Sequence, residues 1–282
     1  MHVLALVSLV CMSLGVAVPP AVAQDGSGLS LRERLAQRRA ARQEAATGPL
    51  AGGTHTIQVT HEGRTRKVVV HVPAGLDSTQ AAPLVLALHG GGGYAEYMAD
   101  DGRYGLISKS DSAGFVVAFP NGYSKFPRGK FATWNAGGCC GDARDRKVDD
   151  VGFLRAVVAH LSARLKLDRA RIYATGMSNG GMMSHRLACE AADLFAAVAS
   201  VAGTEALSVC QPVRPIPVLH IHARNDTHVL FNGGAGKDAF RDESKVMDFV
   251  SAPETIARWV QRDQCRPTPR RVLETPGAYC EA

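Results

Sequence analysis

The sequence predicts an α/β fold, a three-layer sandwich in which a mostly parallel sheet follows an antiparallel N-terminal hairpin. The main evidence is a series of short, nearly continuous apolar runs, which are typical of strands that helices bury on both faces. These runs are PLVLALHG, GFVVAFPNG, RIYATG, FAAVASVAG and IPVLHIHA. They come after THTIQVTHEGRTRKVVVHVP, in which two β-rich halves meet at Glu62-Gly63 and indicate the hairpin. A chain of 282 residues is long enough to bury the core of such a domain.

Helix-type segments separate the apolar runs, as the connections of a parallel sheet require. VDDVGFLRAVVAHLSARLKLD has apolar residues at helical spacing, a second helix is expected after Gly180, and APETIARWVQRD predicts a third. Asp149 and Asp150 stand at the start of the first of these helices. We expect them to cap its free N–H groups and to oppose the helix dipole rather than to take part in catalysis.

The N-terminus has the pattern of a secretory signal. An apolar run from Val3 to Val18 breaks at Pro19-Pro20 and reaches Ala21-Val22-Ala23, a small-x-small cleavage site. Residues 1–23 are therefore a predicted signal peptide, and the mature chain is expected to begin near Gln24. A membrane anchor is the alternative, but the run is short for a spanning helix. We expect export to the medium or the periplasm, with no stable membrane insertion after cleavage.

A basic arm and a linker, residues 24–53, precede the predicted folded domain of residues 54–282. Much of the net charge of +6 lies in LRERLAQRRAARQE, residues 31–44, which is arginine-rich and helix-prone. The simplest interpretation is a solvated helical arm, and attachment to an anionic envelope or polymer surface is the alternative. A nucleic-acid partner is not expected for an exported chain without a recognisable binding module.

Export makes the cysteines candidates for disulfide bonds. Six remain once the signal is removed: Cys139, Cys140, Cys189, Cys210, Cys265 and Cys280. In an oxidising compartment they predict three bridges, and no CxxC pair or His/Cys cluster supports a metal site instead. Cys139 and Cys140 are adjacent, so each is expected to bridge elsewhere. Cys265 and Cys280 flank a strand-like stretch and could staple a hairpin.

A G-x-S-x-G pattern, from Gly176 to Gly180, joins the run RIYATG to the second predicted helix. This position makes Ser178 a candidate nucleophile on a sharp strand-to-helix turn. Glycines are needed on either side of it, because backbone segments come together there and a Cβ would clash. The helix directs its partial positive charge toward an oxyanion that develops beside Ser178. The competing interpretation is a glycine-rich connection with an incidental serine.

A glycine-rich loop, LALHGGGGY, follows another apolar run. Its glycines have no side chains, so their backbone N–H groups can face an incoming carbonyl oxygen. Gly91, or its neighbour Gly90, and Asn179 are the expected oxyanion donors. A phosphate-binding loop is the alternative. The lysine and Ser/Thr of a Walker A motif and the spacing of a dinucleotide fingerprint are both absent from the sequence.

Taken together, HGGGG, TWNAGGCCG, VDDVGFL and RIYATGMSNGGMMSHRLACE resemble the secreted esterases grouped with polyhydroxybutyrate depolymerases and feruloyl esterases. The resemblance runs from about His55 to the C-terminus, and CCG with VDDVGF and GMSNGGM is far more specific than G-x-S-x-G alone. It implies an α/β-hydrolase fold and hydrolysis of a carboxylic ester through a serine acyl-enzyme. The implied substrates are polyhydroxyalkanoate or its oligomers, or hydroxycinnamoyl and acetyl esters on plant polysaccharide. Such chemistry needs only positioned protons and dipoles, so no metal and no organic cofactor is expected.

The resemblance places the triad acid at Asp226, in VLHIHARNDTHVLFNGG, where an aspartate would orient a catalytic imidazole. Asp238 and Asp242 are weaker candidates. The histidine is expected in a G-H-x-W-P-like motif beyond Ala282, because none follows His228 in this chain. We therefore expect a chain truncated before its base, with at most trace activity.

The histidines inside the chain suit the role of base poorly. His220 and His222 lie on or at the end of a predicted strand, and His228 is only two residues past the candidate acid. His89 is expected to hold backbone, and His185 to pack or to be solvated. The sequence thus predicts an exported serine esterase. A peptidase or dienelactone-type hydrolase on the same fold, and a non-catalytic secreted binding protein, are the alternatives.

Overall fold

The computed structural model describes residues 30–35, 48–239 and 249–282. A helical turn covers residues 31–35, within the predicted basic arm, whereas the predicted signal peptide and residues 36–44 lie outside the described residues. Ala46–Ala282 form one unit, described below. No helix in the described part of the chain is both long enough and apolar enough to cross a membrane.

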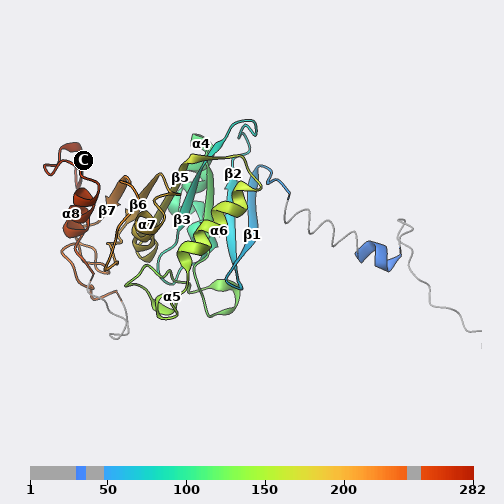
Figure 1. Cartoon of the computed structure of the whole chain (residues 1–282), viewed down its shortest axis with the longest axis horizontal. Coiled ribbons are helices and arrows are strands. Elements are labelled where there is room, and N and C mark those ends of the chain that lie inside the picture. Colours follow the sequence, from blue (N-terminus) through green and yellow to red (C-terminus); the bar gives the residue numbers. More distant parts are fainter. Residues whose placement is uncertain (1–29, 36–47, 240–248) are drawn as a thin grey trace, which may run out of the picture. The chain divides into compact units, whose positions relative to one another are not determined.

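Seven strands form the central sheet within the described residues (Figure 1). They are β1 (Gly53–His61), β2 (Arg64–Val72), β3 (Ala82–Leu88), β4 (Val116–Pro120), β5 (Leu167–Met177), β6 (Ala197–Val201) and β7 (Val218–Ile221). Their order across the sheet is β1-β2-β4-β3-β5-β6-β7. β1 and β2 form the predicted hairpin, with Glu62 and Gly63 at positive φ in its turn. β2 runs antiparallel to β4, and every pair from β4 to β7 is parallel, which confirms the predicted fold class.

Helices cover both faces of this sheet and complete the three layers. They are α2 (Ala95–Met98), α3 (Asp101–Tyr104), α4 (Leu106–Ala113), α5 (Gly141–Asp145), α6 (Asp150–Ser162), α7 (Asn179–Glu190) and α8 (Ala252–Arg262). α6, α7 and α8 contribute to one hydrophobic cluster, while α2 and α4 pack into a second one on the other face. In Figure 1, α6 and α7 lie across the same face. The three helices predicted from the sequence correspond to α6, α7 and α8. A short hairpin of β8 (Arg271–Thr275) and β9 (Ala278–Glu281) follows them.

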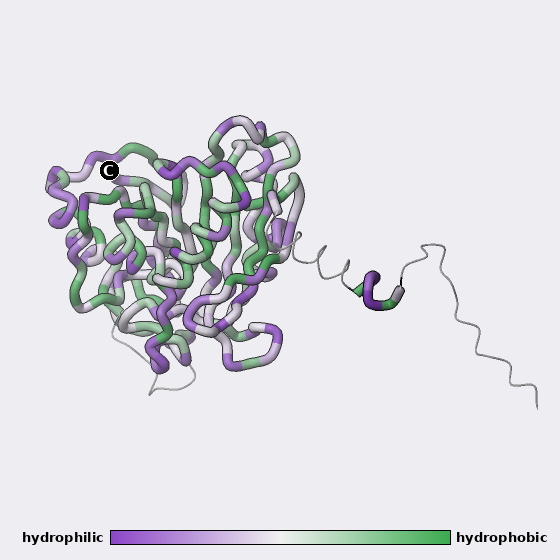
Figure 2. The backbone as a smooth tube through the Cα atoms, turned by 45° about the vertical axis from the view of Figure 1, so that its right-hand side comes forward, coloured by the Kyte–Doolittle hydropathy of each residue, from purple (hydrophilic) through white to green (hydrophobic). Residues whose placement is uncertain are grey.

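The apolar runs exist because both faces of the strands are buried. In β2, Val68 and Val70 belong to the cluster under α6 and α7, while Val69 between them belongs to the cluster under α2 and α4. Alternate side chains of a strand point to opposite faces, so a doubly covered strand is apolar at every position. Figure 2 shows the hydrophobic segments gathered along the strands, with hydrophilic segments in the connecting loops.

The two aspartates at the start of α6 have different roles. Asp149 caps the helix as predicted, since its side chain accepts the Gly152 N–H at 2.9 Å. Asp150 is fully buried, pairs with Arg66 and accepts the Asn135 N–H at 2.7 Å. The capping prediction is therefore wrong for Asp150, because its carboxylate turns away from the helix end to neutralise a buried arginine.

The cysteines pair differently from the prediction. Cys189 and Cys210 form a disulfide with a Cα–Cα distance of 5.2 Å. Cys139 is bonded to its neighbour Cys140, contrary to the expectation that each bridges elsewhere. Cys265 and Cys280 are free. Cys280 stands opposite Leu273 in the β8–β9 hairpin, whereas Cys265 lies before the hairpin, just after α8. The described cysteines thus make two bonds where three were predicted.

Candidate active site

Ser178 lies at the turn between β5 and α7, at the edge of the sheet where the parallel strands end. Its backbone angles are φ 54° and ψ −119°, a sparsely populated conformation for a residue with a side chain. Two hydrogen bonds hold the turn: the Ser178 N–H donates to Val201 O at 2.8 Å, and the Met182 N–H donates to Ser178 O at 2.9 Å. The sharp turn predicted from G-x-S-x-G is present, and it projects the serine from the sheet edge.

The glycines of this pattern lie where other backbone passes too close for a Cβ. On Gly180 a Cβ would lie 2.6 Å from the carbonyl oxygen of His89, and on Gly176 it would overlap the backbone of Gly180. Gly203 meets the carbonyl oxygen of Ser178 in the same way, although its place after an apolar run carries no specific sequence signal. These close approaches fix where the serine stands.

The glycine-rich loop after β3 passes directly beside the turn. A Cβ built on Gly90 would lie 3.6 Å from the Ser178 Cβ, and one on Gly91 would lie 3.7 Å from the Asn179 Cβ. No described residue accepts a hydrogen bond from the backbone N–H of Gly91 or Asn179. Free donors from two separate elements therefore flank Ser178, which is the arrangement that an oxyanion hole needs.

Trp134 ties these two elements together. Its backbone N–H donates to Asn179 Oδ1 at 2.7 Å, and its carbonyl oxygen accepts from Asn179 Nδ2 at 3.0 Å. Its indole Nε1–H donates to the His89 carbonyl oxygen at 2.9 Å. Trp134 and Asn179 are both buried, so this frame is shielded from water. Both polar atoms of the Asn179 side chain are hydrogen-bonded to the Trp134 backbone. The backbone N–H of Asn179 therefore remains as the free donor.

His89 supports the loop and does not act as a base. Its Nε2 accepts the Gly122 N–H at 2.9 Å, so its Nδ1 carries the proton and donates to Gly90 O at 2.8 Å. The ring is fully buried, and this burial lowers its pKa to about 4. Both nitrogens of a neutral imidazole are thus engaged with backbone, in agreement with the role expected from the sequence.

Asp226, the candidate acid, lies in the loop that follows β7, at the same edge of the sheet as Ser178. Its Oδ1 accepts the backbone N–H groups of His228 and Val229 at 2.8 and 3.0 Å, which fixes the plane of the carboxylate. Its Oδ2 is 3.6 Å from His222 Nε2. Asp238 is exposed, and only its backbone N–H, donated to Thr227 O, ties it to this loop. The other weaker candidate, residue 242, lies outside the described residues.

Three histidines form a hydrogen-bonded chain that leads to this loop. Trp259 Nε1 donates to His185 Nδ1 at 3.0 Å, and the rings of His185, His220 and His222 follow at N···N distances of 3.3 and 3.2 Å. His222 Nε2 then donates to the Val229 carbonyl oxygen at 2.8 Å. Because an indole can only donate and a carbonyl can only accept, every ring must be neutral with its proton on Nε2. Burial lowers the pKa of His185 to about 3 and that of His220 to about 4, in agreement with this assignment.

The candidate base is not brought to Ser178 within the described residues. No described histidine ring hydrogen-bonds to the Ser178 hydroxyl, and His185, His220 and His222 are held in their own chain. His228 is exposed and touches Asp226 through its backbone N–H. The structure thus brings together the serine and the free donors and places the acid loop at the same edge.

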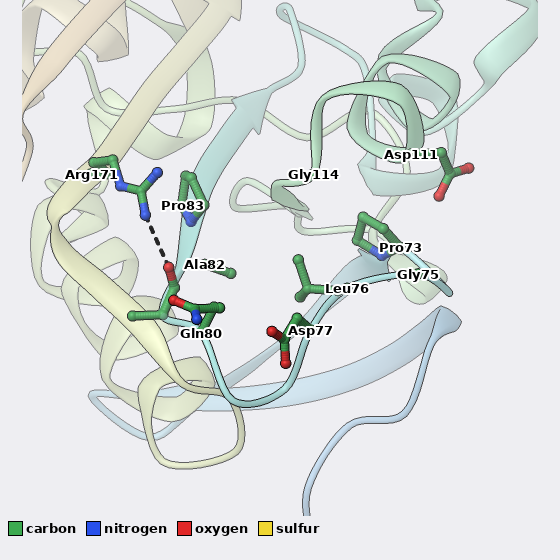
Figure 3. A pocket seen from close by; sticks show the side chains of 11 residues that line it. Pro73, Gly75, Leu76, Asp77, Gln80, Ala82, Pro83, Asp111, Gly114 and Arg171 are labelled. Carbon is green, nitrogen blue, oxygen red and sulfur yellow. Dashed lines mark hydrogen bonds between the residues drawn. The ribbon is translucent and has the colours of Figure 1, made fainter.

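A small cavity of about 330 Å³ lies at the opposite edge of the sheet (Figure 3). It is lined by residues where β3 and β5 begin, among them Ala82 and Arg171, and by Pro73 after β2. Arg171 donates a hydrogen bond to the backbone oxygen of Ala81 at 3.0 Å across its rim. Ser178 stands at the other ends of these strands, so this cavity does not belong to the site.

The doubly wound sheet and the serine on its strained turn define the class of protein as an α/β-hydrolase. The model of the family described as "Esterase PHB depolymerase" matches residues 67–241, and the chain belongs to this family.

Two curated relatives are similar to the chain over 77% of its length. Feruloyl esterase B of Piromyces equi is 34% identical over 221 residues, and the putative esterase NocK of Nocardia uniformis subsp. tsuyamanensis is 37% identical over 224 residues. The chain spans 38% and 60% of the lengths of these two proteins.

Among solved structures, a ferulic acid esterase of Anaeromyces mucronatus superposes with a TM-score of 0.53 and 16% identity, covering 78% of this chain and 82% of that one. A thermostable esterase gives a TM-score of 0.51 and 18% identity, covering 75% of this chain and 51% of that one. At these identities the likeness concerns the fold.

Proposed function

We propose that this protein is a serine esterase that hydrolyses carboxylic esters through an acyl-enzyme. The observation that carries the proposal is the strained turn of Ser178, which lies between two free backbone N–H groups, those of Gly91 and Asn179. Membership of an esterase family supports the same reaction.

In this mechanism the Ser178 oxygen forms a bond to the ester carbonyl carbon while a histidine base takes the hydroxyl proton. The carbonyl oxygen becomes an oxyanion, which the N–H groups of Gly91 and Asn179 stabilise. The intermediate collapses, the C–O bond to the alcohol breaks, and the histidine returns the proton to the leaving alcohol. Water then repeats the sequence on the acyl-serine, releasing the acid and restoring the hydroxyl. Asp226 is proposed to orient the histidine and to stabilise its charged form.

The proposed substrates are esters of polymers, either polyhydroxyalkanoate or plant polysaccharide that carries hydroxycinnamoyl or acetyl groups. The family description and the names of the relatives support this range. We further propose that the protein acts outside the cytoplasm, since residues 1–23 have the pattern of an export signal and Cys189 and Cys210 are disulfide-bonded.

The test compares hydrolysis of 4-nitrophenyl acetate by the natural full-length protein with that of two variants. Ser178→Ala is expected to reduce the rate to background, while Ser112→Ala, an exposed serine on α4, keeps it. Equal rates for the parent and Ser178→Ala would remove Ser178 as the nucleophile. Release of ferulate from bran, compared with clearing of a polyester film, separates the two substrate groups.

A further inference from the structure

A second cavity has a wall that contacts His89, the residue before the oxyanion loop. Its volume is about 530 Å³, and it opens between the start of β2, the end of β4 and the loop of residues 121–129. Gly122 lines it, and the N–H of this residue donates to His89 Nε2 at 2.9 Å. His89 directly precedes Gly90, which adjoins Ser178. The cavity wall is therefore connected to the candidate nucleophile through Gly122, His89 and Gly90.

Four cations lie at or near this cavity, in a group of residues that we call the basic rim: Arg64, Arg128, Lys130 and Arg146. Arg64 and Arg128 line the cavity, while Lys130 lies 5.4 Å from the Tyr94 ring and Arg146 lies 5.9 Å from the ring of Tyr123, itself a lining residue. Apart from an exposed 3.5 Å pair between Arg64 and Glu62, the rim forms no ion pair with any described residue. These cations are thus available to a ligand.

The loop that carries the rim is held in one shape. Arg128 has φ 67°, which is unusual for a residue with a side chain, and it stands between Pro127 and Gly129. Asn121 Nδ2 donates to the Gly129 carbonyl oxygen at 2.8 Å, and Asn121 Oδ1 accepts the Ala95 N–H at 2.8 Å. The backbone of Arg128 is therefore held at the cavity before any ligand arrives.

Two exposed aromatic rings lie next to the rim. Phe126, which lines the cavity, is 48% exposed, and Phe131 is 69% exposed. Their rings meet edge to face with centroids 5.7 Å apart. Phe131 directly precedes Ala132, which pairs with Gly93 of the oxyanion loop. The two rings thus form one exposed apolar surface bordered by charge, and contiguous apolar surface with a polar border is a feature of binding sites.

We propose that this cavity, the basic rim and the two phenylalanines form an accessory binding site for an acidic polysaccharide, one whose sugar units carry carboxylates. The site would hold the polymer while its ester group is presented to Ser178, so the inference rests on the proposed esterase function and names its substrate. Four cations at separate positions match a chain with repeated carboxylates, whereas a hydroxyacid oligomer offers one terminal carboxylate. The phenylalanines offer apolar faces on which sugar rings stack.

Binding is measured with the Ser178→Ala form of the natural full-length protein, so that no hydrolysis interferes and a failure of the esterase proposal leaves this test intact. The probes are tetragalacturonate, neutral xylotetraose and a carboxylate-ended trimer of 3-hydroxybutyrate, each titrated by calorimetry. Tetragalacturonate is expected to bind more tightly than xylotetraose. This preference should shrink when the salt is raised from about 50 mM to about 500 mM, because exposed charges are screened.

Variants locate the site. Arg128→Gln is expected to weaken tetragalacturonate binding by about three- to tenfold and to leave xylotetraose binding unchanged. Phe131→Ala should weaken the binding of both tetragalacturonate and xylotetraose. Arg169→Gln is the matched control, because this exposed arginine lies where β5 begins, at the opposite edge of the sheet. The proposal is overturned if tetragalacturonate binds no more tightly than xylotetraose, or if Arg128→Gln and Arg169→Gln change its affinity equally. It is also overturned if Arg128→Gln weakens binding of the hydroxybutyrate trimer more than binding of tetragalacturonate.

Discussion

Mild acid should destabilise this domain, because two of its buried histidines take up a proton far more readily in the unfolded chain than in the folded one. His89 and His185 are fully buried, and burial lowers their pKa values to about 4 and about 3. In the unfolded chain both return to an ordinary pKa of about 6.5. Because the folded-state pKa is the lower one, the stability from these residues is complete above about pH 6.5. It is lost as the pH falls toward the folded-state values.

The size of the effect follows from proton linkage. At pH 5 each of these histidines is almost fully protonated in the unfolded chain and neutral in the folded one, which lowers the free energy of unfolding by about 2 kcal/mol each. The pair therefore accounts for about 4 kcal/mol between pH 7.5 and pH 5, a large part of the stability of an ordinary domain.

Urea unfolding followed by circular dichroism, at several pH values between 7.5 and 4.5, measures this loss. The decisive variant is His185→Gln, which removes one titrating ring from the chain that begins at Trp259. Its free energy of unfolding is expected to depend less steeply on pH, by about 1.3 kcal/mol per pH unit near pH 5. Ser112→Ala, at an exposed residue that does not titrate in this range, is the control and should keep the parent slope. The reasoning fails if His185→Gln keeps it too.

Three further substitutions test the frame of the site. Gly180→Ala places a Cβ 2.6 Å from the His89 carbonyl oxygen, and the strain should lower the unfolding free energy by about 1–3 kcal/mol in urea melts, together with ester hydrolysis. Asp150→Asn leaves Arg66 buried without its counter-charge, so the urea midpoint should fall by the equivalent of about 3–5 kcal/mol; an unchanged midpoint would show that the arginine is neutralised otherwise. Trp134→Phe removes the indole donor to His89 O, and kcat for 4-nitrophenyl acetate should drop about tenfold with KM nearly constant, less than the loss of a whole oxyanion donor. A change in KM alone would contradict that last role.

The sheet was predictable because its signal is spread over many residues. Each of the five apolar runs contains a strand, since a doubly buried strand must be apolar along its length, and Glu62-Gly63 has the chemistry of a hairpin turn. The turn of Ser178 was equally accessible, because its glycines are forced by close backbone contact and stand in a fixed pattern. Local chemistry and global fold agree at these positions, so the sequence alone suffices.

The contacts that hold the site together were not predictable in the same way. Trp134 binds both Asn179 and His89, although 45 residues separate it from either of them in sequence. The histidine chain likewise depends on the face that β7 turns toward α7, which no local pattern encodes. Asp150 was misassigned for a related reason: a carboxylate at a helix start is usually a cap, and only the distant Arg66 changes its role. Pairings across the fold are set by packing, not by spacing.

The oxyanion loop is held by contacts on its buried side, and this has a consequence for how substrate specificity can change. Trp134 and the pairing of Ala132 with Gly93 hold the donors from the buried side, while Phe126, Arg128 and Phe131 stand on the open side of the same stretch of chain. The side chains of these three exposed residues can therefore be exchanged while Gly129, which Asn121 holds, keeps the loop in place. A mutant library confined to these three positions should therefore change which polymer is bound and leave the chemistry at Ser178 unchanged.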